Sequence, residues 1–159
     1  MRIGVVSDTH MPRTALELPK KMLEDFKNVD LILHAGDLTS PDVLSVLKRI
    51  APTKAVCGNM DDQELQYNLP TKEIITAGKF RIGLMHGFGP PFGLLERVSK
   101  EFSGVDVVVF GHSHSPVNVV KKGVLYFNPG SPTDTIFTRQ NGYGILEIND
   151  KIKGEIIKL

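Results

Sequence analysis

Five short apolar runs in this chain each end directly before residues that can bind a metal ion. The runs cover residues 3–6, 31–33, 55–57, 82–85 and 107–110. The residues that follow them include every histidine of the chain, namely His10, His34, His86, His112 and His114. Carboxylate or amide groups accompany these histidines at Asp8, Asp37, Asn59 and Asp61. Imidazole and carboxylate groups at neighbouring strand ends are the donors of catalytic metal centres, so the pattern predicts one metal site there.

Length and composition are typical of one domain, which we place at residues 1–159. A chain of this length can bury a single sizeable core. The 19 Lys and Arg residues nearly balance the 18 Asp and Glu residues, which gives a formal charge of +1. This balance predicts no basic platform for nucleic acid and no attraction to an anionic membrane. The lone Cys57 excludes an internal disulfide and a cysteine-rich zinc site.

The ends and apolar runs of the chain indicate where the protein works. Every apolar run is well short of the roughly 20 residues that a membrane-spanning helix needs. Residues 1–2, Met-Arg, lead straight into a strand pattern rather than into a signal peptide. We therefore expect a cytoplasmic protein. Apolar residues in the C-terminal strands are compatible with a homodimer.

The first two thirds of the chain alternate strand and helix patterns. Pro19 suits the first turn of a helix that places Met22, Leu23 and Phe26 on one face. The segment 40–42, Ser-Pro-Asp, predicts the start of a second helix, with a capping serine and a proline in the first turn. We expect a third helix over about 92–102, with a stop signal at Gly104.

Beyond residue 115 the pattern changes to strands alone. The expected strands cover residues 117–120, 124–127, 144–148 and 152–157. The pairs Lys122-Gly123 and Asn149-Asp150 are suited to hairpin turns. The sequence therefore predicts an α/β domain whose C-terminal part is a β-meander. Because open α/β sheets bind ligands outside the carboxyl ends of their strands, we expect all five clusters at one sheet edge.

Each cluster alone also has a structural interpretation. Asp8 could cap a turn, Asn59 could serve as a turn residue, and His86 could bond a backbone carbonyl at the edge of the core. The pair of His112 and His114 is more specific, because alternate strand residues face the same way and can chelate one ion. Five such clusters after five successive strand candidates favour a metal site over chance.

The clusters resemble, in order and spacing, the motif set of the calcineurin-like metallophosphoesterase superfamily. The matching motifs are Asp8-x-His10, Gly36-Asp37, Gly58-Asn59-x-Asp61, His86-Gly87 and Gly111-His112-x-His114. The short length and the segment Asn128-Pro-Gly-Ser131 are most similar to the small bacterial and archaeal phosphodiesterase branch. The resemblance spans Ser7 to about Ser131. It implies a four-layer α/β/β/α sandwich, with two mixed sheets flanked by helices, and a dinuclear metal site.

The resemblance also implies the ligands of two divalent ions, with Asp37 bridging them. The first ion would be bound by Asp8, His10, Asp37 and His114. The second ion would be bound by Asp37, Asn59, His86 and His112. Spacing alone would also allow His112 and His114 on one ion. Carboxylate, imidazole and amide ligands without thiolate suit Mn, Ni, Fe, Co or Zn.

The chain departs from the family pattern at one position, and some further residues have open roles. Many members of the superfamily have a histidine after the metal-binding asparagine, where it acts as a general acid or stabilises phosphate charge. Here that position is Met60, so the proton donor to the leaving group is unassigned. We expect Asp61 to orient a ligand or a water molecule, and His34 to lie near the metals without binding them. Arg13 could contact a phosphate oxygen or could be an exposed loop side chain.

These observations predict a metal-dependent phosphodiesterase that acts on a small phosphodiester. In this interpretation a hydroxide bound by both metals attacks phosphorus in line. The predicted catalytic residues are Asp37, Asn59, Asp61 and His86, and the predicted substrate-binding residues are Asn59 and Arg13. The charge balance argues against a processive nuclease.

Two alternatives remain at this point. A phosphomonoesterase or a hydrolase of nucleotide phosphoanhydrides could use the same metal centre. A protein-binding scaffold is the alternative from another class, because the small retromer subunit resembles this fold and has a degraded metal site. All the predicted ligand positions carry competent side chains here, which disfavours a scaffold alone.

Overall fold

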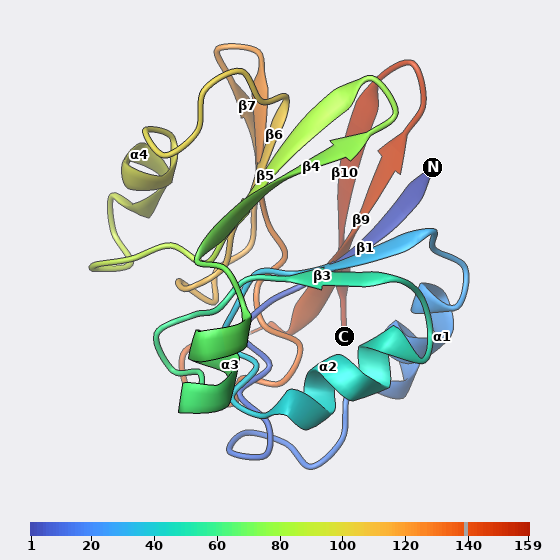
Figure 1. Ribbon diagram of the computed structural model, residues 1–159, viewed down its shortest axis with the longest axis vertical. Helices are drawn as coiled ribbons and strands as arrows, with labels where there is room; N and C mark the ends of the chain where they lie inside the picture. Colours follow the sequence, from blue (N-terminus) through green and yellow to red (C-terminus); the bar gives the residue numbers. More distant parts are fainter. Residues whose placement is uncertain (139) are drawn as a thin grey trace.

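Two five-stranded mixed sheets pack face to face, and helices cover their outer faces (Figure 1). The computed structural model describes residues 1–138 and 140–159. The first sheet has the order β10-β9-β1-β2-β3, formed by Ile152–Lys158, Gly142–Ile148, Arg2–Val6, Leu31–His34 and Thr53–Ala55. The second sheet has the order β4-β5-β6-β8-β7, formed by Lys72–Ala77, Phe80–Met85, Val107–Val109, Val124–Asn128 and Val117–Lys121. The predicted α/β/β/α sandwich of two mixed sheets is confirmed.

The helices are short and pack through a few apolar side chains. Their bounds are Lys20–Phe26 for α1, Pro41–Lys48 for α2, Gln63–Asn68 for α3 and Leu94–Val98 for α4. The first two cover the first sheet, where Phe26 of α1 and Leu47 of α2 are fully buried. Val98 of α4 is fully buried against the second sheet. As predicted, Ser40 caps α2, and its hydroxyl accepts a hydrogen bond from the Asp42 amide at 3.2 Å.

The central strands are buried on both faces, which explains their continuous apolar runs. Successive residues of a strand point to opposite faces. Leu33 of β2 therefore lies in the core between the sheets, while its neighbour Ile32 lies under the helices. In β6, Val109 lies between the sheets and Val108 lies under α4. A strand of this kind shows no polar alternation in the sequence.

The C-terminal strands do not form the predicted β-meander. The hairpin of β7 and β8 joins the second sheet, where β8 pairs with β6. The hairpin of β9 and β10 joins the first sheet, where β9 pairs with β1. The sequence pattern identified these strands but not their partners, because pairing with a distant strand leaves no local signal. The two predicted turns do connect the two hairpins, at 122–123 and near 149–150.

Three other elements differ from the sequence-based expectation. Helix α4 is shorter than the predicted helix 92–102, although Phe102 still packs beside its core cluster. Helix α3 and strand β4 were not predicted. Helix α3 contains one buried residue, Leu65, and β4 is an edge strand with two buried residues, so neither shows a clear apolar period.

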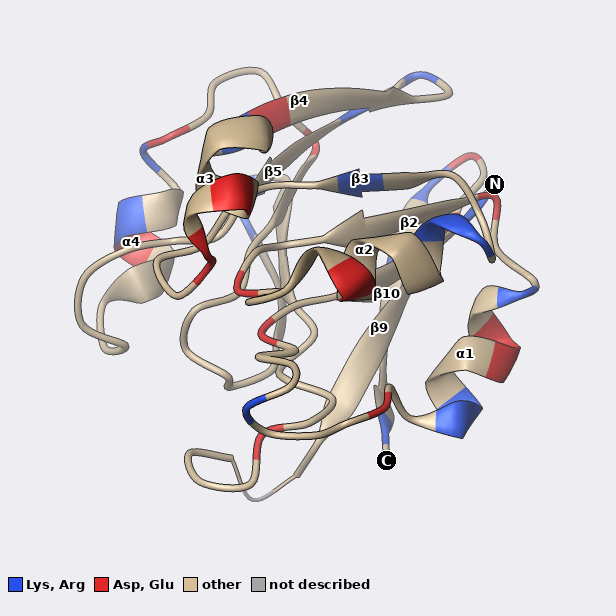
Figure 2. Ribbon diagram, turned by 60° about the horizontal axis from the view of Figure 1, so that its bottom comes forward, with Lys and Arg blue, Asp and Glu red and all other residues tan. Residues whose placement is uncertain are grey.

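The strand ends of both sheets converge on one region of the molecule. β1, β2 and β3 run parallel, with Val6 beside His34 and His34 beside Ala55. β5 and β6 also run parallel, in the second sheet. The five clusters therefore come from two sheets rather than from one edge of a single sheet. In Figure 2 several acidic loop segments lie together in front of these strand ends.

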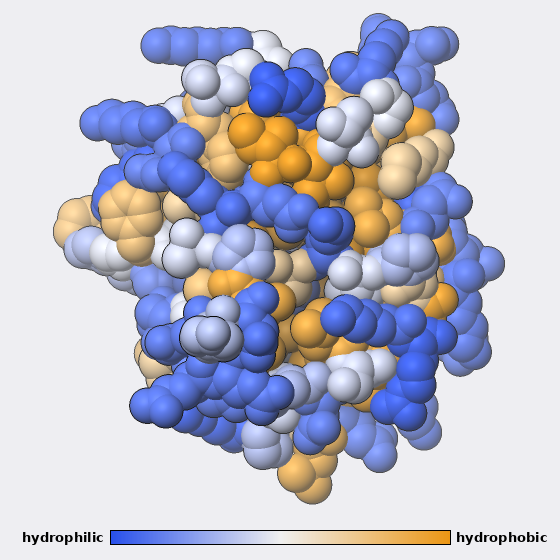
Figure 3. Space-filling model, in the orientation of Figure 1, coloured by the Kyte–Doolittle hydropathy of each residue, from blue (hydrophilic) through white to orange (hydrophobic). Residues whose placement is uncertain are grey.

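The structure bears little on the expected cytoplasmic location and on the expected homodimer. Among the described residues, no helix has the length and apolar character needed to span a membrane. The homodimer stays a prediction. Val119 and Val120, on the edge strand β7, are exposed apolar side chains of the C-terminal strands. Elsewhere, Figure 3 shows apolar surface over β4 and β5 that hydrophilic side chains divide.

Candidate metal centre

Two histidines, one from each sheet, form the first half of the site. His10 follows β1 and His114 follows β6, and their Nε2 atoms lie 3.1 Å apart. Asp8 Oδ1 lies 3.4 Å from Nε2 of His114, and Asp37 Oδ2 lies 3.6 Å from Nε2 of His10. These four residues are the ones that the resemblance implied for the first ion.

A second pair of histidines lies on the other side of Asp37. His86 Nε2 is 3.2 Å from Asp37 Oδ2. His112 Nδ1 is 3.3 Å from His86 Nε2 and 3.1 Å from the side-chain oxygen of Asn59. The structure thus brings together all the predicted ligand residues, and Asp8 Oδ1 also lies 3.9 Å from Nε2 of His86. The same Asp37 oxygen faces both histidine pairs.

Hydrogen bonds on the outer ring nitrogens orient three of these histidines. Nδ1 of His86 donates to the Ala35 carbonyl at 2.7 Å, and Nε2 of His112 donates to the Gly89 carbonyl at 2.6 Å. Nδ1 of His114 donates to the Asp134 carboxylate at 2.6 Å. These acceptors place one ring proton on the outer nitrogen, so the inner nitrogen faces the site and can bind a metal once it is deprotonated.

Asp134 is a site residue that the sequence analysis missed. It follows no apolar run, and the available signal was only its position three residues after Ser131, the end of the Asn-Pro-Gly-Ser segment. That segment holds the site loops together. Ser131 donates from its hydroxyl to the Asp8 carbonyl at 2.6 Å, and Asn128 donates from its amide to the Gly111 carbonyl at 2.8 Å.

The backbone of the candidate ligands is strained. Seven described residues other than glycine have a positive φ, and five of them are candidate ligands: Asp8, His10, Asp37, His112 and His114. Such conformations cost about 1–3 kcal/mol each and persist where the surrounding structure enforces them. Strain of this kind concentrates at functional sites, which supports a functional role for the cluster.

Two glycines allow the site loops to approach closely. A Cβ atom at Gly58 would lie 2.1 Å from Oδ1 of Asp37, and a Cβ atom at Gly111 would lie 2.7 Å from Oδ2 of Asp8. Any side chain at either position would displace a candidate ligand. These contacts give a physical reason for the glycine that precedes Asn59 and for the one that precedes His112.

Asp61 lies behind the site and organises its loops. Its carboxylate accepts hydrogen bonds from the backbone amides of Thr39 at 2.7 Å, Gly58 at 2.7 Å and Asp37 at 3.1 Å. Because these bonds occupy both carboxylate oxygens, the placement favours the orienting role expected for Asp61. Arg13 lines the same cavity as His10.

His34 is fully buried and lies beside the loops of the site. Its Nδ1 accepts from the Gly36 amide at 3.2 Å, so its Nε2 carries the proton and lies 3.2 Å from the Thr9 hydroxyl. Both ring nitrogens are therefore engaged by the protein. Burial, together with the charge of His86, lowers the pKa of His34 to about 3.

Burial and charge set the protonation of the cluster. Burial raises the pKa of Asp8, against the lowering effect of His86 and His114. Burial alone would raise the pKa of Asp37, but its hydrogen bond with His86 and the charge of His86 lower it. Burial alone would lower the pKa of His86, but the hydrogen bond to Asp37 and the charge of Asp8 raise it to about 9. The two buried carboxylates thus require positive charge nearby.

Divalent cations fit this requirement and this donor set. Asp8, His10 and His114 form one group, and Asp8, Asp37 and His86 form a second, with the donor atoms of each within 4.8 Å of one another. Nitrogen and carboxylate donors of this kind suit transition metals better than Ca²⁺. The donor set can therefore bind divalent metal, and Asp8 belongs to both groups.

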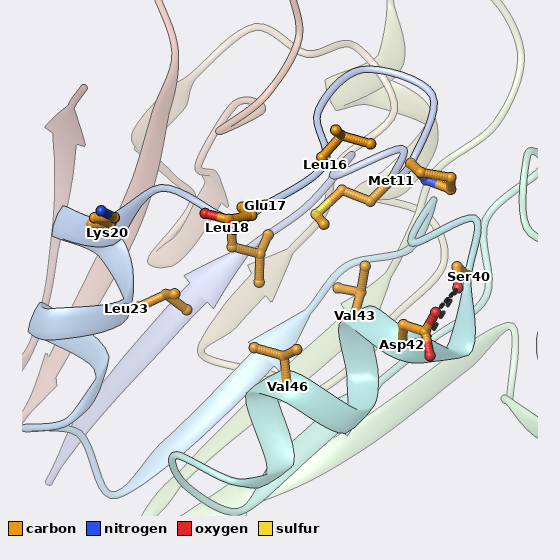
Figure 4. Close-up of a pocket in the computed structure, with 11 residues that line it drawn as sticks. Met11, Leu16, Glu17, Leu18, Lys20, Leu23, Ser40, Asp42, Val43 and Val46 are labelled. Atoms are coloured by element: carbon orange, nitrogen blue, oxygen red, sulfur yellow. Dashed lines mark hydrogen bonds between the residues drawn. The ribbon is translucent and has the colours of Figure 1, made fainter.

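Two cavities adjoin the candidate centre, and a third lies apart from it. A cavity of about 390 Å³ is lined by His10, Asp37, Asn59, His112 and His114, and by Arg13, Met60, Ile136 and Phe137. A neighbouring cavity of about 440 Å³ is lined by Asn59, His86, Phe88, Lys72 and Glu101, among others. The third, of about 450 Å³, lies between loop 11–18, α1 and α2 (Figure 4). Its apolar lining supports the loop that follows His10.

Asp134 provides a first test of this geometry. We expect Asp134→Asn to weaken binding of one metal ion by about 10- to 100-fold, because the amide holds His114 less firmly than the carboxylate does. Metal titration of the stripped protein measures this. Asp106→Asn is the matched control, because Asp106 also accepts a backbone hydrogen bond, from Arg81 at 2.8 Å. Equal affinities in Asp134→Asn and wild type would show that Asp134 does not support the site.

His34 provides a second test, through pH. In the folded protein its pKa is about 3, below the value of about 6.5 in an unfolded chain. The unfolded state therefore binds more protons below pH 6, and the folded state loses about 1.4 kcal/mol of stability per pH unit from this residue. We expect His34→Gln to remove this slope while both metal ions remain bound.

Urea unfolding of the metal-free proteins between pH 7 and 5 measures the difference in slope. Elemental analysis of the metal-loaded variant measures its metal content. Loss of one metal equivalent in His34→Gln would mean that His34 is a ligand.

Comparisons with known proteins agree with this site. The family model described as the calcineurin-like phosphoesterase superfamily domain matches residues 1–151. A probable metallophosphoesterase of Methanothermobacter thermautotrophicus is 40% identical over 161 residues, which cover 99% of this chain and 92% of the relative.

Solved structures give the same result. The structure of a novel archaeal phosphodiesterase has a TM-score of 0.79 and 27% identity, with 100% of both chains covered. The zinc complex of Vps29 from Entamoeba histolytica has a TM-score of 0.77 and 25% identity, with 99% of both chains covered. The chain therefore belongs to the calcineurin-like phosphoesterase superfamily, whose members are phosphoric ester hydrolases that use divalent metal ions.

Proposed function

We propose that this protein is a phosphodiesterase that hydrolyses a small phosphodiester by in-line attack of water at a centre of two divalent metal ions. The observation that carries the diester assignment is the pair of cavities beside the centre. Both are lined by Asn59, one on the side of His10 and His112 and the other on the side of His86. A phosphodiester has two substituents on phosphorus, and a site with room on two sides accommodates both.

The residues that would hold the ions are the two ligand sets that the resemblance implied, with Asp37 shared between them. When bound, such ions supply a nucleophile at neutral pH by lowering the pKa of water, and they neutralise charge on the phosphoryl oxygens. Their donor set is compatible with Mn, Ni, Fe, Co or Zn. The hydrogen bond from the Met60 amide to Oδ1 of Asp37, at 2.7 Å, fixes the orientation of the shared carboxylate.

The other residues of the site position the substrate. Asn59 lies where the two cavities meet, so its amide is placed to contact the phosphate as well as a metal ion. Arg13 lines the cavity on the His10 side, which supports a role for it in binding a phosphate oxygen. His86, held by Ala35, and Asp61, held by three backbone amides, keep the reacting region rigid.

The alternatives are less well supported. A phosphomonoesterase needs room for a single substituent, and the second cavity would then have no occupant. A protein-binding scaffold does not need metal-binding side chains that point into a common site. The structural similarity to Vps29 does not identify a binding partner for this chain. Basic and acidic residues are mixed on α1 and α4 (Figure 2), which does not favour a nucleic-acid platform. Cytoplasmic location remains part of the proposal.

A substrate panel on the metal-stripped protein tests the proposal. Mn, Ni, Fe, Co or Zn is added back singly, and hydrolysis of bis(4-nitrophenyl) phosphate, 4-nitrophenyl phosphate and ATP is measured. We expect kcat/KM for the diester to exceed that for the monoester by at least about 10-fold, a difference of roughly 1.4 kcal/mol in transition-state stabilisation. Preference for the monoester or for ATP with every metal would contradict the diester assignment.

Variants in the same assay test the shared ligand. Asp37→Ala should lose both ions and the activity, because it removes one donor from each ion, whereas His10→Ala should keep one ion. Asp42→Ala is the matched control, because this exposed carboxylate lies at the start of α2. Two tightly bound ions in Asp37→Ala, by elemental analysis, would rule out the shared role.

Met60 leads to a prediction about the leaving group. Its side chain is 44% exposed and lines the cavity beside Asp37, and a thioether cannot donate a proton. General acid catalysis is commonly worth about 10²- to 10⁴-fold, so we expect aryl diesters to be cleaved readily and alkyl diesters poorly. Met60→His should flatten this dependence on leaving-group pKa and raise monoesterase relative to diesterase activity. Wild-type turnover that is independent of leaving-group pKa, with chemistry rate-limiting, would reveal another proton donor.

A further inference from the structure

Exposed apolar side chains line one side of the candidate centre. Met60, Ile136 and Phe137 all line the cavity of about 390 Å³ that contains His10 and His114. Ile136 is 76% exposed and Phe137 is 77% exposed. Large apolar side chains left in water at a cavity that also contains a few polar groups are typical of ligand contact surfaces. Their position beside the phosphate site makes a substituent of the phosphate ester the natural occupant.

The backbone of this apolar pair is tied to the metal site. The Asp134 carboxylate accepts hydrogen bonds from the amides of Ile136 at 2.7 Å and Phe137 at 3.1 Å. The same carboxylate accepts from Nδ1 of His114. One group therefore orients a candidate ligand and the two apolar residues together, so the distance between metal and apolar surface is set by the fold.

The ring of Phe137 has a free face. It contacts the His114 ring in a T-shaped arrangement, with centroids 5.7 Å apart, and remains largely exposed. Phe88, on the other cavity, differs because the Arg97 guanidinium lies over its ring at 6.0 Å. Aromatic rings pack on one another by offset or edge contacts. Of the two phenylalanine rings that line these cavities in the described part of the chain, Phe137 is thus the one that carries no cation and can pack against a ligand.

We propose that Phe137, with Ile136, forms a wall that binds an aromatic ring carried by the phosphate ester, so that Phe137 determines specificity for aryl-bearing over alkyl-bearing substrates. This inference rests on the proposed function, because it takes the phosphate group to lie at the metal centre. The ring can be a simple aryl group or a nucleobase. Both present the same flat apolar face to Phe137.

Phosphonates test the wall without catalysis. Binding of phenylphosphonate, cyclohexylphosphonate and methylphosphonate to the metal-loaded protein is measured by calorimetry. We expect wild type to bind the phenyl compound about 3- to 10-fold more tightly than the methyl compound, and more tightly than the cyclohexyl compound. Phe137→Ala should bring the phenyl-to-methyl ratio close to one, while Phe137→Trp should retain the preference.

Phe92→Ala is the matched control. Phe92 is 81% exposed and lines a separate cavity beside α4, so its loss should leave the ratio unchanged. Elemental analysis of Phe137→Ala shows whether the metal content is intact, so that a changed ratio reports on the wall. Thymidine 5′-phosphate against deoxyribose 5-phosphate then separates the nucleobase from the simple aryl group as the preferred ring.

The outcomes separate this inference from the proposed function. Equal phenyl-to-methyl ratios in wild type and Phe137→Ala would overturn the wall, even if wild type hydrolyses diesters. A ratio that falls only in Phe137→Ala supports the wall, even if wild type hydrolyses monoesters alone and the diesterase proposal fails.

Discussion

The Asp37 carboxylate occupies the point at which the two sheets and the two histidine pairs meet. Oδ1 accepts a hydrogen bond from the Met60 amide. Oδ2 lies 3.6 Å from Nε2 of His10 and 3.2 Å from Nε2 of His86. Its own backbone amide is held by Asp61. Because Asp37 comes from the first sheet and His86 from the second, the packing of the sheets determines the geometry of the centre. The glycine at 58 leaves room for this carboxylate and for no side chain of its own.

The strained backbone of the candidate ligands is stabilised by groups that take no part in metal binding. Ser131 and Thr133 donate to the carbonyls of Asp8 and Thr9 at 2.6 and 2.7 Å. These bonds hold the loop after β1 in a left-handed conformation that its own residues disfavour. The energy comes from buried hydrogen bonds and from the core between the sheets, so the rigid sandwich supports a loop site that would not persist in isolation.

The sequence predicted those parts of the structure that a short stretch of residues determines by itself. The apolar runs before Asp8, Asp37 and His86 reflect strands that are buried on both faces, and the ligands stand where those strands end. Asp134 could not be found this way, because it becomes a site residue only through the distant contact with His114. The sheet membership of β9 depends in the same way on a partner far along the chain, β1. Strand β4 pairs with its neighbour β5, but its two buried residues give no clear apolar period. The metal-binding motifs supplied the topology that the apolar pattern could not.

The contact between His10 and His114 has a consequence for folding. Each histidine belongs to a different sheet, so an ion held by both would connect the halves of the sandwich, in the way that a disulfide connects distant segments. Such an ion binds the folded chain and finds no comparable site in the unfolded one. The stability of the protein would then depend on the concentration of free metal. At one hundred times the dissociation constant, metal binding would raise the free energy of unfolding by about 2.7 kcal/mol. The metal supply of the cell would then determine both the activity of the protein and the fraction of it that is folded.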